Sequence, residues 1–318
     1  MTIKLGMVMD PIDHININKD TSFAMMLEAQ VRGWEIHYMQ LSDLYLRDGV
    51  AHAQTQQVTV QRDQVHWYSI VSEQNLPLAE LDCIMMRKEP PVDQAYIYAT
   101  HILELAEQAG VYVVNKPQSL RDANEKLFTA WFPQCCTETL VTSQASLIRD
   151  FLNEHQEIIL KPLDGMGGVS VFHLHSNDPN LSVIIETISA NGTQQVIAQR
   201  YLPEIKEGDK RILIVNGEVV PYALARIPAQ GETRGNIAAG GKAKGQYLSD
   251  RDQWIAQQVG PILKEKGLVF VGIDVIGDYL TEINVTSPTC VQELDAQFGL
   301  NICAQLMSHV ETKISNAN

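Results

Sequence analysis

Several features that would point to a membrane or secreted protein are missing from this 318-residue sequence. No uncharged apolar run approaches the roughly 18 residues that span a bilayer. The start of the chain has no basic segment followed by an apolar one, so no signal peptide is predicted. Cysteine is scarce at five residues, an odd number, and no pair has C-x-x-C spacing. Together these absences predict a soluble cytoplasmic protein with reduced thiols.

Positive charge is also scarce. Lys and Arg number 24 against 38 Asp and Glu, which gives a net charge of −14. A surface this acidic repels nucleic acid and anionic membranes, so neither is predicted as a partner. If the protein handles a polyanionic substrate, its cations must be concentrated in one place. A hydrophobic fraction of 45% and a length of about two domains predict an ordinary globular protein.

The first third of the sequence alternates between strands and helices. Strands are expected at 3–9, 35–39, 81–86 and 111–114, with helices from Thr21 or Ser22 to Gly33 and over 94–108. This order predicts an α/β, doubly wound parallel sheet. Asp10 and Arg87 follow strands, at the carboxyl edge where such sheets bind ligands. The polar segment 49–75 is interpreted as a β-excursion or a partner surface.

The pattern changes after Pro117 to a mixed α+β region of about 200 residues. Ser119 is expected to cap a helix that continues to Trp131. Helices are also expected near 145–155, 180–190 and 249–267, and strands at 139–142, 158–161, 169–174, 196–199, 268–276 and 280–285. Asn216-Gly217 predicts a hairpin turn. Two domains are therefore predicted, over 1–119 and 120–318.

A glycine-rich loop follows the strand that ends at Lys161. Its glycines, Gly165, Gly167 and Gly168, would let backbone N–H groups turn toward phosphate oxygens while the lysine supplies charge. The loop is neither a G-K-[ST] P-loop nor a G-x-G-x-x-G helix start. A plain hairpin with a surface lysine remains the alternative.

Polar residues next follow the strand at 196–199. A strand end at Gln199 to Leu202 can present backbone groups to an adenine edge, and Asp209 can accept hydrogen bonds from a ribose. Arg211 is available to a phosphate or carboxylate as a bidentate donor. Taken alone, this segment also fits an ordinary polar strand and turn.

Three oxygen-bearing side chains lie on the last two predicted strands. Glu282 and Asn284 are two residues apart, so they share one strand face. Asp274 joins that face if the intervening turn has an odd count, for example residues 277–279. Such an oxygen set suits Mg²⁺ bridged to phosphates. The alternative is the polar face of an exposed hairpin.

Residues 227–245 are too long and glycine-rich for a simple connection. They contain Arg234, Lys242 and Lys244. A mobile lid that brings cations over an anionic ligand is one interpretation, and a disordered surface loop is the other.

The order of these elements resembles the ATP-grasp ligases over residues 120–318, and the whole chain resembles the prokaryotic glutathione synthetase family. The stretches that carry the resemblance are Met9 to Ile12, Met86 to Pro91, Asn115 to Asp122, Ile159 to Gly168, Arg234 to Asn236 and Thr281 to Thr289. The resemblance implies an ATP-grasp fold of two α+β subdomains, about 120–200 and 201–318, with a lid at 227–245.

The resemblance also implies a role for each matching residue. The implied ATP-binding residues are Lys126, Lys161, Gly165, Met166, Gly167, Gly168, Gln199, Arg200, Tyr201, Leu202, Asp209 and Asn236. The implied metal ligands are Asp274, Glu282 and Asn284. The implied substrate residues are Arg87, Arg226, Ser287, Pro288 and Thr289, and the implied catalytic residues are Arg211, Arg234 and Lys161.

The implied reaction joins γ-glutamylcysteine and glycine with ATP and Mg²⁺, for which Mn²⁺ substitutes. It passes through an acyl phosphate, so the lack of a Ser/His/Asp arrangement is expected. The resemblance further implies a homotetramer. Two alternatives remain: another ATP-grasp carboxylate–amine ligase, and a nucleotide-binding regulator without turnover.

His173 and His175 share one face of a predicted strand and could bind a metal. No third ligand is evident in the sequence, so they are interpreted as solvated strand residues. Cys135 and Cys136 are interpreted as buried packing residues.

Overall fold

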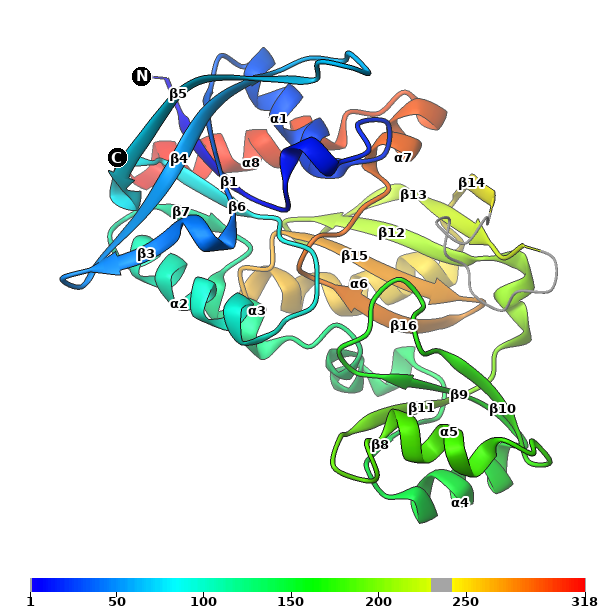
Figure 1. The fold of residues 1–318 in the computed structure, drawn as a ribbon. Coiled ribbons are helices and arrows are strands. Elements are labelled where there is room, and N and C mark those ends of the chain that lie inside the picture. Colours follow the sequence, from blue (N-terminus) through cyan, green and yellow to red (C-terminus); the bar gives the residue numbers. More distant parts are fainter. Residues whose placement is uncertain (1, 230–241, 318) are drawn as a thin grey trace.

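A computed structural model describes residues 2–229 and 242–317 as three β-sheets with flanking helices (Figure 1). The parallel part of the first sheet consists of β1 (Lys4–Val8), β2 (Glu35–Met39), β6 (Cys83–Met86) and β7 (Tyr112–Val114). All of β6 and most of β1 are buried, as expected for strands covered on both faces. The predicted doubly wound α/β arrangement is confirmed.

Helices α1 (Thr21–Val31) and α2 (Gln94–Gln108) connect these parallel strands. The predicted cap of α1 is wrong by one or two positions. Asp20 caps it, because its carboxylate accepts a hydrogen bond of 2.6 Å from the backbone N–H of Phe23.

The segment 49–75 extends the same sheet and confirms the expected β-excursion. Strands β3 (Leu44–Arg47), β4 (Val50–Val60) and β5 (Tyr68–Pro77) are antiparallel, and β4 pairs with β2. The long β4–β5 hairpin crosses the upper side of the molecule in Figure 1.

The helix predicted from Ser119 to Trp131 is wrong, because two short elements replace it. Helix α3 spans Pro117–Asp122, and a 3₁₀ turn spans Leu127–Trp131. Between them the side chain of Asn124 accepts hydrogen bonds from the backbone N–H groups of Lys126 (3.1 Å) and Leu127 (2.9 Å). Such local bonds compete with a continuous helix. Ser119 lies inside α3, where its hydroxyl donates to the carbonyl oxygen of Lys266.

The second sheet is antiparallel, in the order β10 (Phe172–His175), β9 (Glu157–Pro162), β11 (Val196–Arg200), β8 (Thr139–Thr142). Helices α4 (Ala145–His155) and α5 (Leu181–Ile188) lie together at the bottom of Figure 1. Apolar residues of α4, α5, β9, β10 and β11 form a core of their own.

The third sheet is also antiparallel, in the order β14 (Lys242–Tyr247), β13 (Glu218–Ile227), β12 (Asp209–Val215), β15 (Phe270–Ile276), β16 (Tyr279–Asn284). The predicted turn between β12 and β13 is confirmed: Asn216 and Gly217 have φ angles of 51° and 82°, as a two-residue hairpin loop requires. Of the predicted loop 227–245, residues 242–245 belong to β14, and 230–241 lie outside the described residues.

Helix α6 (Asp250–Glu265) covers the third sheet and has the predicted cap at Ser249. Helices α7 (Val291–Phe298) and α8 (Ile302–Ala317) follow the last strand. The remaining 3₁₀ turns are Ile12–His14, Leu41–Asp43, Leu78–Glu80, Pro133–Cys135 and Pro203–Glu207.

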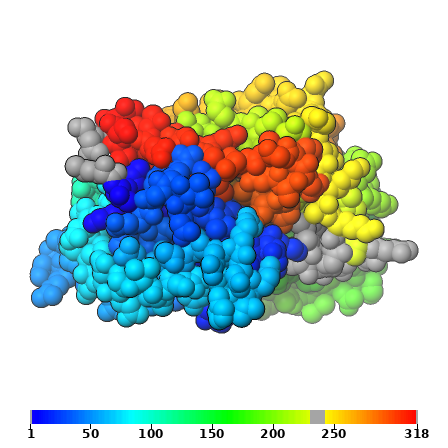
Figure 2. All heavy atoms as spheres, turned by 90° about the horizontal axis from the view of Figure 1, so that it is seen from above, coloured from blue at the N-terminus to red at the C-terminus, as the bar shows by residue number. Residues whose placement is uncertain are grey.

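The last helix returns to the first sheet. Arg32, at the end of α1, donates hydrogen bonds to Glu311, Ser308 and the carbonyl oxygen of Ala304 on α8. Figure 2 shows the end of the chain in red beside the blue N-terminal segment. In the described parts of the chain, no helix combines the length and the apolar character needed to cross a bilayer.

Candidate active site

A cavity of about 1000 Å³ is lined by residues of the second and third sheets and by segments that follow strands of the first sheet. The sequence-predicted site residues on its wall are Arg87, Lys126, Lys161, Gly165, Met166, Gly167, Gly168, Gln199, Arg200, Tyr201, Leu202, Asp209, Arg211, Arg226, Asp274, Glu282, Asn284, Ser287 and Thr289. Pro288 is not on the wall, although its carbonyl oxygen accepts a hydrogen bond from Arg87. Arg234 and Asn236 lie outside the described residues.

Two lysines from separate segments meet one carboxylate in the cavity. The ammonium nitrogen of Lys161, on β9, lies 3.2 Å from an oxygen of Glu282 on β16, and that of Lys126 lies 3.8 Å from the same oxygen. Burial raises the pKa of Glu282, but the two ammonium groups outweigh burial and hold the pKa below its ordinary value. Glu282 is therefore ionised at neutral pH.

Two arginines enclose a second carboxylate. Arg211 on β12 pairs across the sheet with Asp274 on β15, and its Nε and Nη2 atoms donate to the two carboxylate oxygens at 2.5 and 2.9 Å. Arg226 on β13 contacts the same carboxylate at 2.9 Å. Burial alone would raise the pKa of Asp274, but the guanidinium groups of Arg211 and Arg226 hold it well below its usual range.

Asp209 on β12 is the neighbouring carboxylate. One of its oxygens accepts a hydrogen bond of 2.5 Å from Arg226, and the other is buried without a hydrogen-bond partner among the described residues. Burial raises the pKa of Asp209 to about 6, and the negative charges of Asp274 and Glu282 add to the effect although Arg226 opposes it. The unpaired oxygen is an acceptor available to a ligand in the cavity.

A β-bulge brings Asp274 opposite Glu282. The turn between β15 and β16 contains Gly277 and Asp278, two residues rather than the three suggested by the sequence. The register shift between Asp274 and Val275 leaves Thr281 as an extra residue, so Asp274 pairs with Glu282 instead of Thr281. The bulge thus supplies the odd count that places both carboxylates on one face.

Asn284 completes the group of oxygen donors. Its side-chain nitrogen donates a 3.1 Å hydrogen bond to Asp274, which leaves its side-chain oxygen as an acceptor. Asp274, Glu282 and Asn284 thus offer carboxylate and amide oxygens, the donors that Mg²⁺ prefers.

The glycine loop and the strand end at 199–202 lie on the same cavity wall. Lys126 donates a hydrogen bond to the carbonyl oxygen of Gly165, which ties this lysine to the loop. The backbone N–H of Tyr201 donates a 3.1 Å hydrogen bond to the carbonyl oxygen of Glu157 on β9, which holds the strand end in place.

Arg87 comes to the cavity from the carboxyl end of β6. Only 4% of this residue is exposed, and its guanidinium donates to the hydroxyl of Ser22 (3.1 Å) and to the carbonyl oxygen of Pro288 (2.9 Å). Burial lowers its pKa to about 10, so the side chain remains a cation at neutral pH.

Glu125 is a cavity residue that sequence reasoning missed. One of its oxygens accepts hydrogen bonds from the backbone N–H groups of Val285 (2.9 Å) and Thr286 (3.0 Å) and from the Thr286 hydroxyl (2.8 Å). It thereby holds the segment after β16 against the cavity. The only local signal was its position beside Lys126, because the contact joins residues about 160 positions apart.

Two family models together match most of the chain. The prokaryotic glutathione synthetase N-terminal domain matches residues 3–121, and the prokaryotic glutathione synthetase ATP-grasp domain matches residues 125–299. A glutathione synthetase of Vibrio vulnificus (strain YJ016) is 60% identical over 314 residues, which cover 99% of each chain. A glutathione synthetase of Escherichia coli (strain K12) is 59% identical over 312 residues, 98% of this chain and 99% of the relative.

Two solved structures with the same fold share less of their sequence with this chain. The D-cycloserine synthetase DcsG has a TM-score of 0.67 at 15% identity and covers 99% of this chain and 100% of its own. The ATP-grasp ligase PsnB, solved with a minimal precursor, Mg and ADP, has a TM-score of 0.62 at 17% identity, with 98% of both chains covered. The predicted ATP-grasp fold is confirmed, and the chain belongs to the prokaryotic glutathione synthetase family.

Proposed function

We propose that this protein is an ATP-dependent ligase that joins the cysteinyl carboxylate of γ-glutamylcysteine to the amine of glycine. The observation that carries the proposal is identity of about 60% to glutathione synthetases over nearly the full length of both chains. The cavity supports it, because cations and oxygen donors suited to a nucleotide and to a carboxylate substrate line one space.

The nucleotide phosphates would bind to Lys126, Lys161 and the backbone N–H groups of Gly165 to Gly168. Both lysines share Glu282 in the free protein, so they are already held on one side of the cavity. The base would lie along Gln199 to Leu202, and the ribose would use the unpaired oxygen of Asp209. Cations concentrated in this cavity explain how a chain with net charge −14 would accept ATP.

Mg²⁺ would fit the oxygen donors of Asp274, Glu282 and Asn284, which line one cavity. The amide nitrogen of Asn284 donates to Asp274, so its amide oxygen remains for the ion. When bound there, Mg²⁺ would neutralise charge on the phosphates. We extend the proposal to Mn²⁺ as a substitute ion. Arg211 and Arg226 compensate Asp274, so the carboxylate remains ionised for the ion.

The reacting carboxylate would lie near Arg211, Arg226, Ser287 and Thr289, next to the oxygen donors that would hold the metal. Arg87 would anchor a second carboxylate of the peptide: its cationic guanidinium is on the cavity wall and forms no ion pair with a described carboxylate. Hydrogen bonds to Ser22 and Pro288 fix its direction, which favours a bidentate contact.

The reaction follows from this arrangement. The substrate carboxylate attacks the γ-phosphorus of ATP and displaces ADP, which gives an acyl phosphate. The glycine amine then attacks the acyl carbon, loses a proton and displaces phosphate. The enzyme's part is to position the reactants and neutralise charge, so no side-chain nucleophile is needed.

We also propose the parts of the picture that depend on the family resemblance. The chain would divide into domains 1–119 and 120–318, the second with subdomains near 120–200 and 201–318. A lid over 227–245, which contains Arg234 and Asn236, would shield the acyl phosphate from water. The protein would be a homotetramer with a cytoplasmic location.

The test is ADP release by the purified protein with Mg²⁺, ATP, γ-glutamylcysteine and glycine, against reactions that omit each substrate. Release is expected only when both the acid and the amine are present. Glu282→Ala should abolish it, whereas Asp48→Asn, at an exposed ion pair with Arg47 outside the cavity, should not.

Two outcomes would overturn the proposal in different ways. Release with another acid and amine, but not with this pair, would indicate a different ATP-grasp ligase. ATP binding without release for any pair would indicate a nucleotide-binding regulator.

A further inference from the structure

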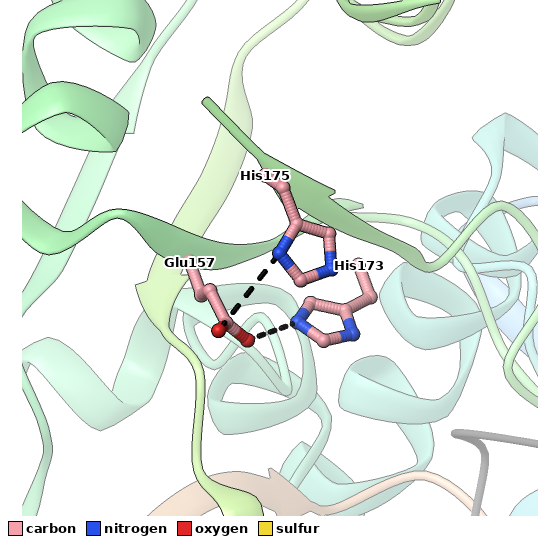
Figure 3. Close-up of side chains that lie close together, drawn as sticks. All are labelled: Glu157, His173 and His175. Carbon is pink, nitrogen blue, oxygen red and sulfur yellow. Dashed lines mark hydrogen bonds and ion pairs between the residues drawn. The ribbon is translucent and has the colours of Figure 1, made fainter. Parts of the chain in front are cut away.

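Two imidazoles and a carboxylate lie together on the edge of the second sheet (Figure 3). The Nε2 atom of His173 is 3.0 Å from one oxygen of Glu157, and the Nδ1 atom of His175 is 3.8 Å from the other. The ligand atoms of the three residues all lie within 4.8 Å of one another. Glu157 is a third potential ligand that was not evident from the sequence.

Strand register explains why Glu157 is the third member. It lies directly opposite His175 across the β9–β10 pair, and His173 is two residues along on the same face of β10. Figure 3 shows both rings directed at the Glu157 carboxylate, with one oxygen toward each ring. Two imidazoles from one strand and a carboxylate from its neighbour thus converge on one point.

We propose that Glu157, His173 and His175 form a binding site for a divalent transition-metal ion of the Zn²⁺ class. Two imidazole nitrogens and a carboxylate oxygen are a donor set that suits Zn²⁺, with water in the fourth position. Zn–N and Zn–O bonds of about 2.0–2.1 Å at a tetrahedral centre require ligand atoms about 3.4 Å apart. The two rings lie 3.0 and 3.8 Å from different oxygens of the carboxylate, and the three ligand atoms lie within 4.8 Å of one another, so the donors are close to the spacing that an ion requires.

The site is open to ions in solution. The side chains of His175 and Glu157 are 48% and 45% exposed, while that of His173 is 17% exposed. In the described sheet, β10 is an edge strand with β9 as its neighbour. An ion can therefore reach the carboxylate without a change in the fold.

The site is separate from the candidate active site, because none of its three residues lines the cavity. It nevertheless touches the cavity wall through Tyr201. The ring of His173 stacks on that of Tyr201, with centroids 3.9 Å apart and planes at 18°. This stacking limits the movement of the His173 ring, which favours a preformed ligand position. The proposal does not rest on the proposed ligase activity.

The experiment measures Zn²⁺ binding to the full-length protein by calorimetry, without nucleotide and in excess Mg²⁺. Mg²⁺ prefers oxygen ligands to imidazole nitrogens, so excess Mg²⁺ competes with Zn²⁺ for the oxygen donors in the cavity and leaves the histidine site open to Zn²⁺. His173→Gln and His175→Gln should each weaken one equivalent of Zn²⁺ binding by on the order of 100-fold. His101→Gln is the matched control, since His101 also lies near a glutamate, Glu104 (3.9 Å), but on a helix.

Zinc binding that is unchanged in both His173→Gln and His175→Gln would overturn the proposal, and so would wild-type protein that binds no Zn²⁺. Co²⁺ as a substitute probe distinguishes ligand types. Absorption bands of thiolate-to-cobalt charge transfer that persist in His173→Gln would assign the ion to cysteine and also refute the site. Circular dichroism without metal checks that each variant is folded.

Discussion

Replacing Asp274 with asparagine tests the charge network in the cavity. The substitution keeps the shape of the side chain but removes its charge. Arg211 and Arg226 would then lose a carboxylate that each contacts at 2.9 Å or less. Their side chains are only 7% and 12% exposed, so water cannot compensate fully for the lost charge.

The expected cost can be worked from this arrangement. Removing one partner of a buried ion pair lowers the free energy of unfolding by about 3–5 kcal/mol, because a buried charge remains uncompensated. Arg226 keeps Asp209 as a partner, so the lower half of that range is expected. Since domains are stable by about 5–15 kcal/mol, the loss should be easy to detect.

The assay is urea unfolding of the ligand-free protein, followed by circular dichroism at about pH 7. Glu138→Gln is the matched control, because Glu138 and Arg200 are 57% and 31% exposed and such a pair contributes less than about 1 kcal/mol. A loss for Asp274→Asn no larger than that of the control would refute the reasoning.

The pH dependence gives a second check on the same variant. The pKa of Asp274 is lowered in the folded state, so its contribution is present above the unfolded pKa of about 3.9 and is lost as the pH falls further. The difference between wild type and Asp274→Asn should therefore shrink below about pH 4. A difference that grows at lower pH would contradict the proposed cause.

Three further predictions concern residues around the site and in the first sheet. Burial lowers the pKa of His37 below its ordinary value of about 6.5, so the folded state loses stability as the pH falls below that value. In His37→Gln the urea midpoint should therefore fall less between about pH 7 and 5 than in the wild type, and an unchanged slope would contradict this. In Gly272→Ala the new Cβ would lie 2.8 Å from Cδ of Arg211, so the free energy of unfolding should fall by about 1–3 kcal/mol and ADP release should slow. Wild-type values for both quantities would show that the arginine can move away. Glu125→Ala leaves two backbone N–H groups without their acceptor, so the free energy of unfolding in urea should fall by about 3 kcal/mol. Glu125→Gln keeps an acceptor oxygen and should retain most of the wild-type stability.

Features that depend on neighbouring residues could be predicted from the sequence. The apolar runs of β1 and β6 and the helices between strands indicated a parallel sheet, which is confirmed. Asn216-Gly217 indicated a hairpin because few residue pairs adopt two positive φ angles in succession. The two-residue period of a strand was enough to put Glu282 and Asn284 on one face.

Features that depend on which distant segments pair could not be predicted in this way. The bulge in the β15–β16 pair decides that Asp274 faces Glu282, and the contact of Glu125 with Thr286 joins residues 161 positions apart. The β9–β10 register likewise makes Glu157 a partner of the two histidines. The sequence by itself thus determined most of the elements and the chemical types of most site residues, through local backbone preference and side-chain periodicity. Only the tertiary structure decided their partners, because cross-strand register depends on how whole segments pack.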